Sequence, residues 1–421
     1  MSLIVFEDEL VENFYPLTLT RASFEIFLGT RTLLESLMQS FQVSSVSVFS
    51  RNYLEGVIKK RIGNQNVSRF DNDGDVLLVN GLVNPSSKAF SKLAKREGRF
   101  IAFSGGKVVL ARLPGRVLVR LNRNGKFPFI DIVEIKEYDR LEAGESTLYR
   151  YPWELVDDNA NAIAGQAKRR SSEQIVSEGV FVTGPRNRLI VASDAKFEAP
   201  VAIDTRNGPV MVGKGAEIQA MSRLEGPCYI GKGTRVRSGI IGEGTSIGDT
   251  CAVGGEIEHS IISDYTNKAH LGYLGHSIVG SWVNLGAQST NSNLKNTYGG
   301  IKVRVNNEQV NTSRTKVGCY IADNVKTAIG SLILAGKKIG VSSHVYGVVA
   351  EDVASFTIHA KSLGKKSYEL ELDSAIETQR RMMDRRGIKQ TKDDIELLKH
   401  IFQITKAVRK SMGIVRGKFK I

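Results

Sequence analysis

Cysteine is scarce in this chain. The three that occur, Cys228, Cys251 and Cys319, are scattered and lack the paired spacing of a metal site. We therefore expect a reducing, cytoplasmic setting without disulfide bonds. Long apolar runs are also missing, since none approaches the roughly 18 residues of a membrane span, so we expect no membrane association. The early acidic run Glu7-Asp8-Glu9 is not the pattern of a secretory signal.

The chain carries a net charge of +14, and much of the excess is in its last part. Residues 361–421 contain 16 Lys and Arg against 8 Asp and Glu. Nucleic-acid binding is one reading of such a basic segment. Interleaved aromatic residues are missing from it, however, and its spacing is that of two amphipathic helices. We therefore expect a solvated or docking face and no nucleic-acid partner.

The most regular pattern is a spacing of six between aliphatic residues from about residue 201 to residue 353. The positions that keep this period are Val212, Ile218, Leu224, Ile230, Val236, then Ile241, Ile247, Val253, and later Ile321, Thr327, Ile333, Ile339 and Val345. Period six differs from that of a helix or an ordinary strand and is typical of a hexapeptide β-helix. We predict a left-handed, triangular coil of short parallel strands, with the aliphatic residues pointing inward and the first turns beginning as early as Val180.

A chain of 421 residues is too long for one hydrophobic core. We predict an α/β domain over 1–167, a polar linker over 168–179, the β-helix over 180–360 and a helical tail over 361–421. Within the first domain the pattern predicts strands at Ser2–Phe6, Val46–Phe49, Asp75–Asn80 and Phe100–Phe103, and helices at Thr30–Phe41 and Lys88–Glu97. This alternation favours a Rossmann-like, three-layer sheet of the nucleotide-binding sort.

Two helices are expected in the tail. Ser374 and Glu377 have the spacing of a capping box, which predicts a helix from Ser374 to about Arg386, closed by Gly387. Thr391 opens a second helix, whose apolar face is formed by Ile395, Leu398, Phe402, Thr405, Val408 and Met412. We expect both helices to pack against the coil or a neighbouring chain.

The period of six breaks over residues 288–318, a polar stretch rich in asparagine. Long polar excursions from a coil usually form or cover a site. His270 lies on a coil edge close to this stretch, where its imidazole could act as a general base at neutral pH.

Residues 16–21, Pro-Leu-Thr-Leu-Thr-Arg, resemble the second half of the signature of sugar-1-phosphate nucleotidylyltransferases. In that family a glycine-rich loop precedes this half and cradles phosphates, and a Pro-Lys pair follows it. Here Glu9–Tyr15 and Ala22-Ser23 stand in those places. Leu82 stands where the family has an aspartate that binds Mg²⁺, and leucine cannot ligate a hard cation. The resemblance implies the fold, with Arg21 as a candidate phosphate contact, and Mg²⁺ only if this domain is active.

A second resemblance is more specific. His270-Leu-Gly-Tyr273-Leu-Gly, followed by Val283-Asn284-Leu-Gly-Ala287, resembles the acetyltransferase domain of the bifunctional glucosamine-1-phosphate acetyltransferase / N-acetylglucosamine-1-phosphate uridylyltransferase family. The likeness extends over nearly the whole chain and is tightest over 253–401. The chain looks like a divergent branch of that family, with a degenerate or unorthodox nucleotidyltransferase domain.

The resemblance implies a role for each matching position. His270 would deprotonate the sugar amine, Tyr273 would contact the sugar phosphate and Asn284 would bind the sugar. The backbone of Ala287 would meet the acetyl group of acetyl-CoA, and Asn293 would orient the base and bind acetyl-CoA. Lys316 would bind substrate, with Arg314 as its rival in register. Glu258 stands where the family has a phosphate-binding lysine, so an acceptor other than glucosamine 1-phosphate stays open.

Three functions follow as hypotheses. The first is a homotrimeric, acetyl-CoA-dependent N-acetyltransferase acting on an amino-sugar phosphate. The second is a sugar-1-phosphate nucleotidylyltransferase using UTP or dTTP, and the third is a non-enzymatic sensor of sugar nucleotides. A zinc site at His259, His270 and His276 is disfavoured, because five residues separate the last two where such trimers use four. Asn284 and Asn293 could also simply ladder along the coil.

Overall fold

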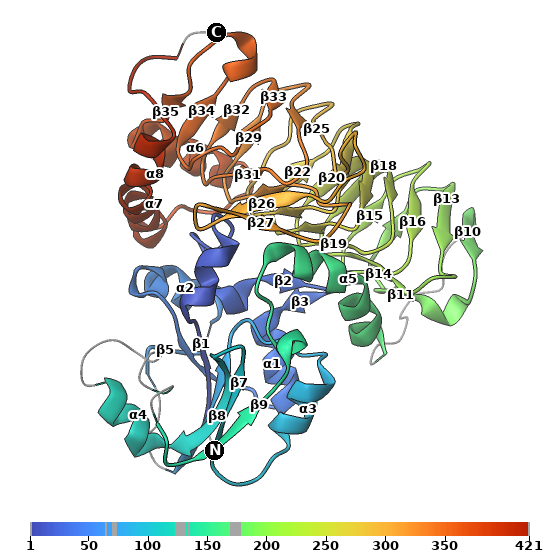
Figure 1. Ribbon diagram of the computed structural model, residues 1–421. Coiled ribbons are helices and arrows are strands. Elements are labelled where there is room, and N and C mark those ends of the chain that lie inside the picture. The colour runs from blue at the N-terminus through green and yellow to red at the C-terminus, as the bar shows by residue number, and fades with distance from the viewer. Residues whose placement is uncertain are drawn as a thin grey trace. The chain divides into compact units, whose positions relative to one another are not determined.

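The computed structural model describes residues 2–63, 65–69, 74–122, 132, 135–168 and 178–419, and the chain divides into two compact units (Figure 1). The first unit contains the residues up to Phe14, Arg21–Ile26 and Arg31–Tyr151. The second contains Tyr15–Thr20, Phe27–Thr30 and Pro152–Ile421. Most of the linker predicted over 168–179 lies outside the described residues, and the predicted domain boundaries stay a prediction.

The first unit is an α/β sheet of seven strands in the order β5-β4-β1-β6-β8-β7-β9. Its strands are β1 (Ser2–Phe6), β4 (Ser47–Phe49), β5 (Asn66–Val67), β6 (Asp75–Asn80), β7 (Phe100–Ser104), β8 (Lys107–Pro114) and β9 (Asp139–Glu142), with β3 (Arg31–Thr32) outside the sheet. β1 pairs in parallel with β4 and β6, whereas β8 runs antiparallel to β6 and β7. The central strands β1 and β6 are almost continuous runs of buried apolar residues, as expected for a sheet covered on both faces.

The helices of this unit are α1 (Leu33–Phe41), α2 (Glu55–Arg61), α3 (Lys88–Ala94) and α4 (Gly115–Asn122). Thr32 caps α1, because its side chain accepts from the backbone N–H of Glu35. The predicted helix at Thr30–Phe41 therefore begins at Leu33, after the short strand β3. The predicted strands agree with β1, β4, β6 and β7 to within one residue.

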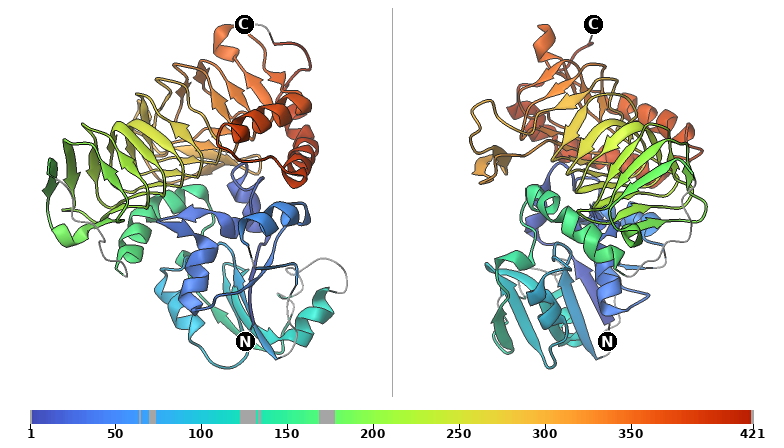
Figure 2. Two further views of the ribbon diagram at one scale, coloured as in Figure 1. Left: turned by 180° about the vertical axis from the view of Figure 1, so that it is seen from behind. Right: turned by 90° about the vertical axis from the view of Figure 1, so that its right-hand side faces the viewer.

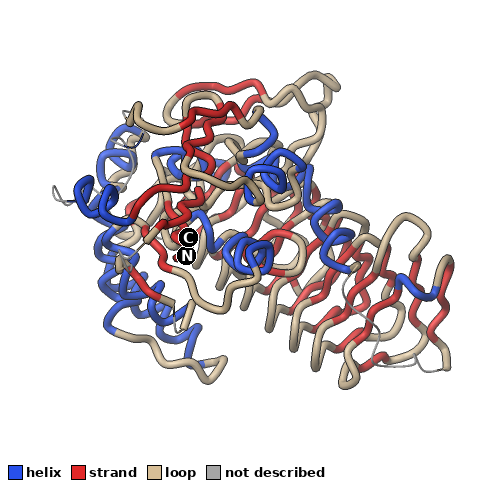
Figure 3. Tube along the Cα trace, turned by 90° about the horizontal axis from the view of Figure 1, so that it is seen from below, coloured by secondary structure: helices blue, strands red, loops and turns tan. Residues whose placement is uncertain are grey.

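The second unit is a parallel β-helix with three faces, whose coils stack side by side (Figures 2 and 3). The first face contains β11 (Leu189–Val191), β14 (Val210–Val212), β17 (Cys228–Ile230), β19 (Thr245–Ile247), β21 (Ile261–Ile262), β24 (Ile278–Val279), β28 (Tyr320–Ile321) and β31 (Lys338–Ile339). The second contains β12 (Lys196–Phe197), β15 (Glu217–Ile218), the beginnings of β18 (Arg235–Ile241) and β20 (Ala252–Glu258), β22 (Asn267–Lys268), β29 (Lys326–Thr327), β32 (His344–Val345) and β34 (Thr357–His359). The third contains β10 (Val180–Thr183), β13 (Val201–Asp204), β16 (Arg223–Glu225), the ends of β18 and β20, β23 (Tyr273–Gly275), β25 (Thr290–Asn291), β30 (Leu332–Ile333) and β33 (Val348–Val349). The α/β unit followed by a parallel β-helix confirms the predicted fold class.

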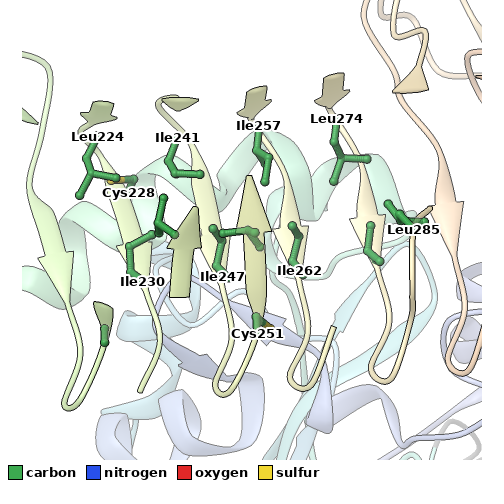
Figure 4. Close-up of a cluster of buried hydrophobic side chains, with 14 of the residues drawn as sticks. Leu224, Cys228, Ile230, Ile241, Ile247, Cys251, Ile257, Ile262, Leu274 and Leu285 are labelled. Atoms are coloured by element: carbon green, nitrogen blue, oxygen red, sulfur yellow. The ribbon is translucent and has the colours of Figure 1, made fainter. Parts of the chain in front are cut away.

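The aliphatic residues of the six-residue period fill the interior of the coil. Leu224, Ile230, Ile241, Ile247 and Ile257 are completely buried and stack on one another from coil to coil (Figure 4). The three cysteines are free, and all are buried in this interior. Burial raises the pKa of each thiol, for Cys319 to about 12, so these cysteines serve as small apolar residues of the core.

The polar excursion from the coil, residues 288–318, contains more regular secondary structure than its composition indicates. Thr290 and Asn291 still form a rung of the third face, and the chain leaves the coil only afterwards. An antiparallel hairpin of β26 (Lys302–Val305) and β27 (Glu308–Asn311) follows. The side chains of Ile301, Val303 and Val305 are buried, so the hairpin packs through an apolar side of its own.

Helix α5 (Pro152–Ala167) packs within the second unit, together with β2 (Phe27–Leu28). Asn159 joins it to the coil, because its Nδ2 donates to the carbonyl of Gly244 at 2.8 Å and its Oδ1 accepts from Ser246 Oγ at 3.1 Å. The helix belongs to the predicted segment 1–167, and Asn159 bonds it to the β-helix.

The tail forms α6 (Leu372–Asp384), α7 (Lys392–Ile404) and α8 (Lys406–Ser411) beside the last coils, after β35 (Tyr368–Glu369) pairs antiparallel with β34 (Figure 2). The start of the second helix predicted at Thr391 is confirmed, and Thr391 forms a capping box with Asp394 there. The one predicted at Ser374 is wrong, because α6 begins at Leu372 as soon as the chain leaves β35. The second predicted helix is broken at Thr405, which leaves Val408 47% exposed on α8 instead of on a continuous apolar face.

Candidate functional site

The turn that carries His270 is anchored by a buried lysine. Lys268, at the end of β22, is 2% exposed. Its Nζ donates to the carbonyl oxygens of Gly254 at 2.8 Å, His270 at 3.0 Å and Gly272 at 2.7 Å. Burial lowers the pKa of Lys268 to about 8, although the nearby Glu256 favours the charged form. Three backbone acceptors hold this ammonium, so the turn is fixed and the His270 imidazole is presented on the exposed surface.

His270 and Ala287 lie at the same corner, where the second face turns into the third, on adjacent coils. Asn267 and Asn284 are bridge partners, and each precedes one of these residues by the same distance along the chain. The next pair of backbone groups is also joined, because Gln288 N–H donates to the Leu271 carbonyl at 2.9 Å. The structure therefore places the predicted base beside the predicted contact of the acetyl group.

Large apolar side chains flank this corner. Leu271 follows His270 and is 71% exposed, and Ile329, two coils further on and one coil beyond Ala287, is 79% exposed. Gly330, next to Ile329, donates its N–H to the carbonyl of Ala287 at 2.8 Å. A polar base thus lies next to an apolar strip across successive coils. This composition suits a ligand with one reactive end and a long, weakly polar arm.

Asn284 lies on another face of the coil. It is exposed on the second face, where its backbone bridges Asn267 and Lys326. Arg386, which follows helix α6, donates to Asn267 Oδ1 at 2.7 Å. Asn284 is therefore on the same coil as Ala287, but it belongs to a polar row on the second face. The remaining predicted contacts, Tyr273 and Asn293, lie toward the third face.

Tyr273 and Asn293 are joined in one hydrogen-bonded network with Glu258 and His276. The Tyr273 hydroxyl donates to Glu258 Oε1 at 2.5 Å and accepts from Asn293 Nδ2 at 2.6 Å. The same Asn293 nitrogen lies 2.9 Å from His276 Nδ1. Burial, followed by Glu258 and Glu256, raises the pKa of Tyr273, so its phenol keeps its proton. The structure therefore joins the predicted residues Tyr273 and Asn293 directly. It adds Glu258 and His276 as neighbours that the sequence did not predict for them.

His276 and His259 occupy the corner where the third face turns into the first, on adjacent coils. Their ring centroids are 4.8 Å apart, and His259 Nε2 lies 3.7 Å from Glu243 Oε1. Burial, helped by His259, lowers the pKa of His276 to about 4. A neutral imidazole can accept a hydrogen bond at Nδ1 from Asn293. Sequence reasoning weighed these histidines only as metal ligands, although their spacing of one coil could have indicated stacking.

The two candidate cations of the excursion have different surroundings. Lys316 is exposed, bridges Leu294 through its backbone and lies close enough to His276 to lower the pKa of that histidine. Arg314 Nε donates to Asp157 Oδ2 at 2.5 Å and is therefore paired with helix α5. Of the two residues left open by the sequence, Lys316 is the one near the Tyr273 network. Within the described ranges, no cluster of three or more His, Cys, Asp or Glu side chains could hold a metal ion.

In the first unit, Arg21 lies near the carboxyl end of β1. The acidic residues Glu7, Asp8 and Glu9 follow that strand directly. Glu7 is 4% exposed, and its carboxylate accepts from the Ser23 N–H at 2.6 Å and from Arg51 at 3.1 Å. Arg51 also donates to the backbone carbonyl of Arg21 at 2.9 Å. An internal ion pair therefore lies at the carboxyl end of β1, directly before the segment Glu9–Tyr15 that stands where the resemblance expects a glycine-rich phosphate cradle.

The next residue, Asp8, is half-buried and makes hydrogen bonds within the same unit. It accepts from Asn80 Nδ2 at 2.8 Å and from the Leu10 N–H at 3.0 Å. Burial raises the pKa of Asp8 to about 6. Asn80 Oδ1 in turn accepts from the N–H of Leu82, so the Asn-Gly-Leu turn is closed on itself.

Comparison with known proteins gives one family match and several similar proteins and structures. Residues 3–174 match the family model described as sugar nucleotidyl transferase. The bifunctional sugar-1-phosphate nucleotidylyltransferase/acetyltransferase of Sulfurisphaera tokodaii is 35% identical over 100 residues, which are 23% of this chain and 25% of that protein. The bifunctional protein GlmU of a Nostoc species is 28% identical over 209 residues, which are 44% of this chain and 42% of that protein.

The matched segments thus span a quarter to two-fifths of the length of these two relatives. Among solved structures, the UDP-N-acetylglucosamine acyltransferase of Francisella novicida matches with a TM-score of 0.33 and 13% identity, covering 56% of this chain and 87% of that one. The assignment of the β-helix rests on the coils themselves.

A segment that matches the sugar nucleotidyl transferase model is thus followed by a parallel β-helix. Over part of its length the chain is similar to bifunctional GlmU-like proteins, in agreement with the resemblance seen in the motifs at Arg21 and His270. None of the helices in the described part of the chain is both long and apolar enough to cross a membrane.

Proposed function

We propose that the protein is an acetyl-CoA-dependent N-acetyltransferase whose acceptor is an amino sugar or an amino-sugar derivative such as a sugar phosphate. The observation that carries this proposal is the exposed imidazole of His270 beside the backbone of Ala287, on a turn fixed by Lys268. A base must be held within reach of the reacting amine, and a turn tied by a buried ammonium supplies that rigidity.

In the proposed reaction His270 accepts a proton from the acceptor amine, and the amine nitrogen attacks the thioester carbonyl. Acetyl-CoA supplies the activated acetyl group, and the coenzyme A thiolate leaves as the amide forms. Backbone N–H groups near Ala287 would stabilise the developing oxyanion. Leu271 and Ile329 would lie along the apolar part of the coenzyme arm. Asn284 and Tyr273 would hold the sugar, Asn293 would contact the thioester and Lys316 would bind substrate.

We also propose that the working form is a homotrimer. The outward row of the third face carries Leu332 and Val348 on paired strands, and Leu334 follows on the same side. Each of these side chains is more than a third exposed. Neighbouring copies would cover them and enclose the corner of His270. The buried, unpaired cysteines are compatible with a reducing cytoplasm.

A second candidate function is sugar-1-phosphate nucleotidyl transfer with UTP or dTTP, which the family match over residues 3–174 favours. The internal Glu7–Arg51 ion pair and the closed Asn80 turn argue against the standard site for nucleotide phosphates and Mg²⁺. Release of pyrophosphate from UTP or dTTP with a sugar 1-phosphate, dependent on Mg²⁺, would establish this activity. Nucleotide binding without such release would leave sensing as the role of this domain.

The test of the acetyltransferase is thiol release from acetyl-CoA with a panel of amino sugars and amino-sugar phosphates. His270→Ala should lower turnover by roughly 10² or more, the usual scale for a general base. His400→Ala, which removes another exposed histidine on α7, is the matched control and should leave turnover close to wild type. Turnover unchanged by His270→Ala would remove His270 from the mechanism, and no turnover with any acceptor would overturn the proposal.

A further inference from the structure

We propose that the acceptor presents an uncharged or positively charged hydrogen-bond donor, a hydroxyl or an amine, to Tyr273, and that Glu258 excludes a phosphate from this position. The inference rests on the proposed acetyltransferase function and specifies the part of the acceptor remote from the reacting amine. It changes the role of Tyr273 from a phosphate contact to a contact for a donor group.

The backbone directs the Tyr273 hydroxyl to Glu258. Tyr273 and Gly275 are on the same side of β23, and Gly275 is the register partner of Glu258 on β20. The phenol lies over Gly275 so closely that a Cβ there would be 2.0 Å from the hydroxyl oxygen. Because Gly275 has no side chain, the ring folds along the strand and its hydroxyl meets the carboxylate of the neighbouring coil.

The hydrogen bonds among Tyr273, Glu258 and Asn293 use their donor groups and leave acceptor atoms available around the Tyr273 hydroxyl. Tyr273 has one hydroxyl proton, and it goes to Glu258. Asn293 directs its Nδ2 group to both the Tyr273 oxygen and His276 Nδ1. The atoms that can still take a bond are the second lone pair of Tyr273, the Oδ1 of Asn293 and further lone pairs of the Glu258 carboxylate. A phosphate dianion offers only acceptors, so it does not complement this surface, whereas a hydroxyl or an ammonium does.

The charged groups around Tyr273 also disfavour a phosphate at this position. Glu256 and Glu258 both lie near the Tyr273 hydroxyl, and Glu243 lies beside the adjoining His259. His276, which contacts Asn293, is neutral at pH 7 because burial lowers its pKa to about 4. Lys316 brings a positive charge near His276, and Lys268 is near Glu256. The Tyr273 hydroxyl itself is bonded to Glu258, at 2.5 Å, and to Asn293. A phosphate placed there would face a carboxylate at hydrogen-bond distance, which is strongly unfavourable.

The experiment compares glucosamine with glucosamine 1-phosphate on the full chain, by thiol release from acetyl-CoA and by calorimetric binding in the presence of coenzyme A. We expect the wild type to favour glucosamine by roughly tenfold or more in kcat/KM, because of the like charges. Glu258→Lys should reverse this preference, and Glu258→Gln should reduce it. Glu198→Lys makes the same change of charge at an exposed position at the end of β12 and should leave the preference as in the wild type.

A wild type that prefers glucosamine 1-phosphate in turnover or binding would overturn the inference, and so would a preference unaffected by Glu258→Lys. If neither amine is acetylated but glucosamine binds more tightly and Glu258→Lys reverses this order, the inference stands and the proposed reaction fails. If neither compound is acetylated nor bound, both fail. If both are acetylated equally by the wild type and by Glu258→Lys, the acetyltransferase stands and the role of Glu258 is rejected.

Discussion

The side-chain nitrogen of Asn293 lies 2.9 Å from Nδ1 of His276, although one residue opens the excursion and the other sits on a corner of the coil. This contact orients the Asn293 amide, because a neutral imidazole accepts from Nδ2 and the Tyr273 oxygen accepts from the same group. The contact therefore links the protonation state of a half-buried histidine to the position of two residues proposed to hold substrate.

The stability of the protein should fall in mild acid partly because of His276. Its pKa is lowered to about 4 in the folded chain by burial, against roughly 6.5 in an unfolded one. The unfolded state therefore binds more protons between these values, so the contribution of His276 is complete above about pH 6.5 and is lost as the pH falls toward about 4.

Urea unfolding of the wild type and of His276→Asn at pH 7.5, 6 and 5 checks this prediction. Asparagine keeps an acceptor for Asn293 but does not titrate, so the variant should lose less stability on acidification. Burial also lowers the pKa of His344 to about 4, so some slope should persist. Equal slopes in the two proteins would show that His276 is not responsible.

Replacing Gly272 by alanine should disrupt the corner of His270. Gly272 has a φ of +128°, and a Cβ there would lie 2.2 Å from the Ser289 carbonyl oxygen of the next coil. We expect a loss of about 1–3 kcal/mol from backbone strain alone, with the clash adding to it and acetyl transfer reduced.

The matched control is Gly165→Ala in helix α5, where a Cβ meets no other atom within 4 Å. An alanine in a helix is favoured over glycine by up to about 1 kcal/mol, so this variant should unfold at equal or higher denaturant concentration. Equal effects of the two substitutions would contradict the close approach of the coils at Gly272.

Replacing Lys268 by methionine should loosen the same turn. The variant keeps most of the length of the side chain but leaves the carbonyls of Gly254, His270 and Gly272 without the ammonium. Each buried group left without a partner costs about 1–3 kcal/mol, so a loss of about 2–4 kcal/mol in the free energy of unfolding is expected by chemical denaturation.

Lys214→Met, at an exposed position of the coil, is the comparison and should change stability by less than about 0.5 kcal/mol. If Lys268→Met is as stable as Lys214→Met, the ammonium does not anchor the turn. If it is less stable but retains full turnover, the turn is anchored without being needed to present His270.

Two arginines that bind the same glutamate should differ sharply in their contribution to the tail. Arg409 is 2% exposed, lies 4.1 Å from the ring centroid of Phe402 and donates to Glu369 Oε2 at 2.8 Å. Arg416 donates to the other oxygen of Glu369 at 3.1 Å, but its side chain is 79% exposed.

Arg409→Leu should lower the free energy of unfolding by about 3–5 kcal/mol, because it removes the buried partner of the Glu369 carboxylate. Arg416→Leu should cost less than about 1 kcal/mol, as exposed ion pairs do. Thermal and urea unfolding, together with protease cleavage in the tail, measure the difference. A similar small loss in both variants would show that the tail docks without Arg409.

The sequence by itself determined the β-helix, because an inward aliphatic residue every sixth position is a local requirement of each coil and repeats regardless of what lies outside it. The same holds for the strands of the first unit and for the Thr391 cap, where residues a few positions apart suffice. The start of α6 was misplaced since it depends on where β35 leaves the sheet, which the spacing of Ser374 and Glu377 does not encode.

The neighbours of the site residues were decided only by the tertiary structure. Motif spacing could place His270 and Ala287 at one corner, because both follow the period of the coil. It could not show that Tyr273 folds over Gly275 to meet Glu258, or that Asn293 returns from the coil to His276. Side-chain direction and contacts between coils depend on which surfaces stacking brings together, and a six-residue period fixes the inward positions while leaving the outward ones free.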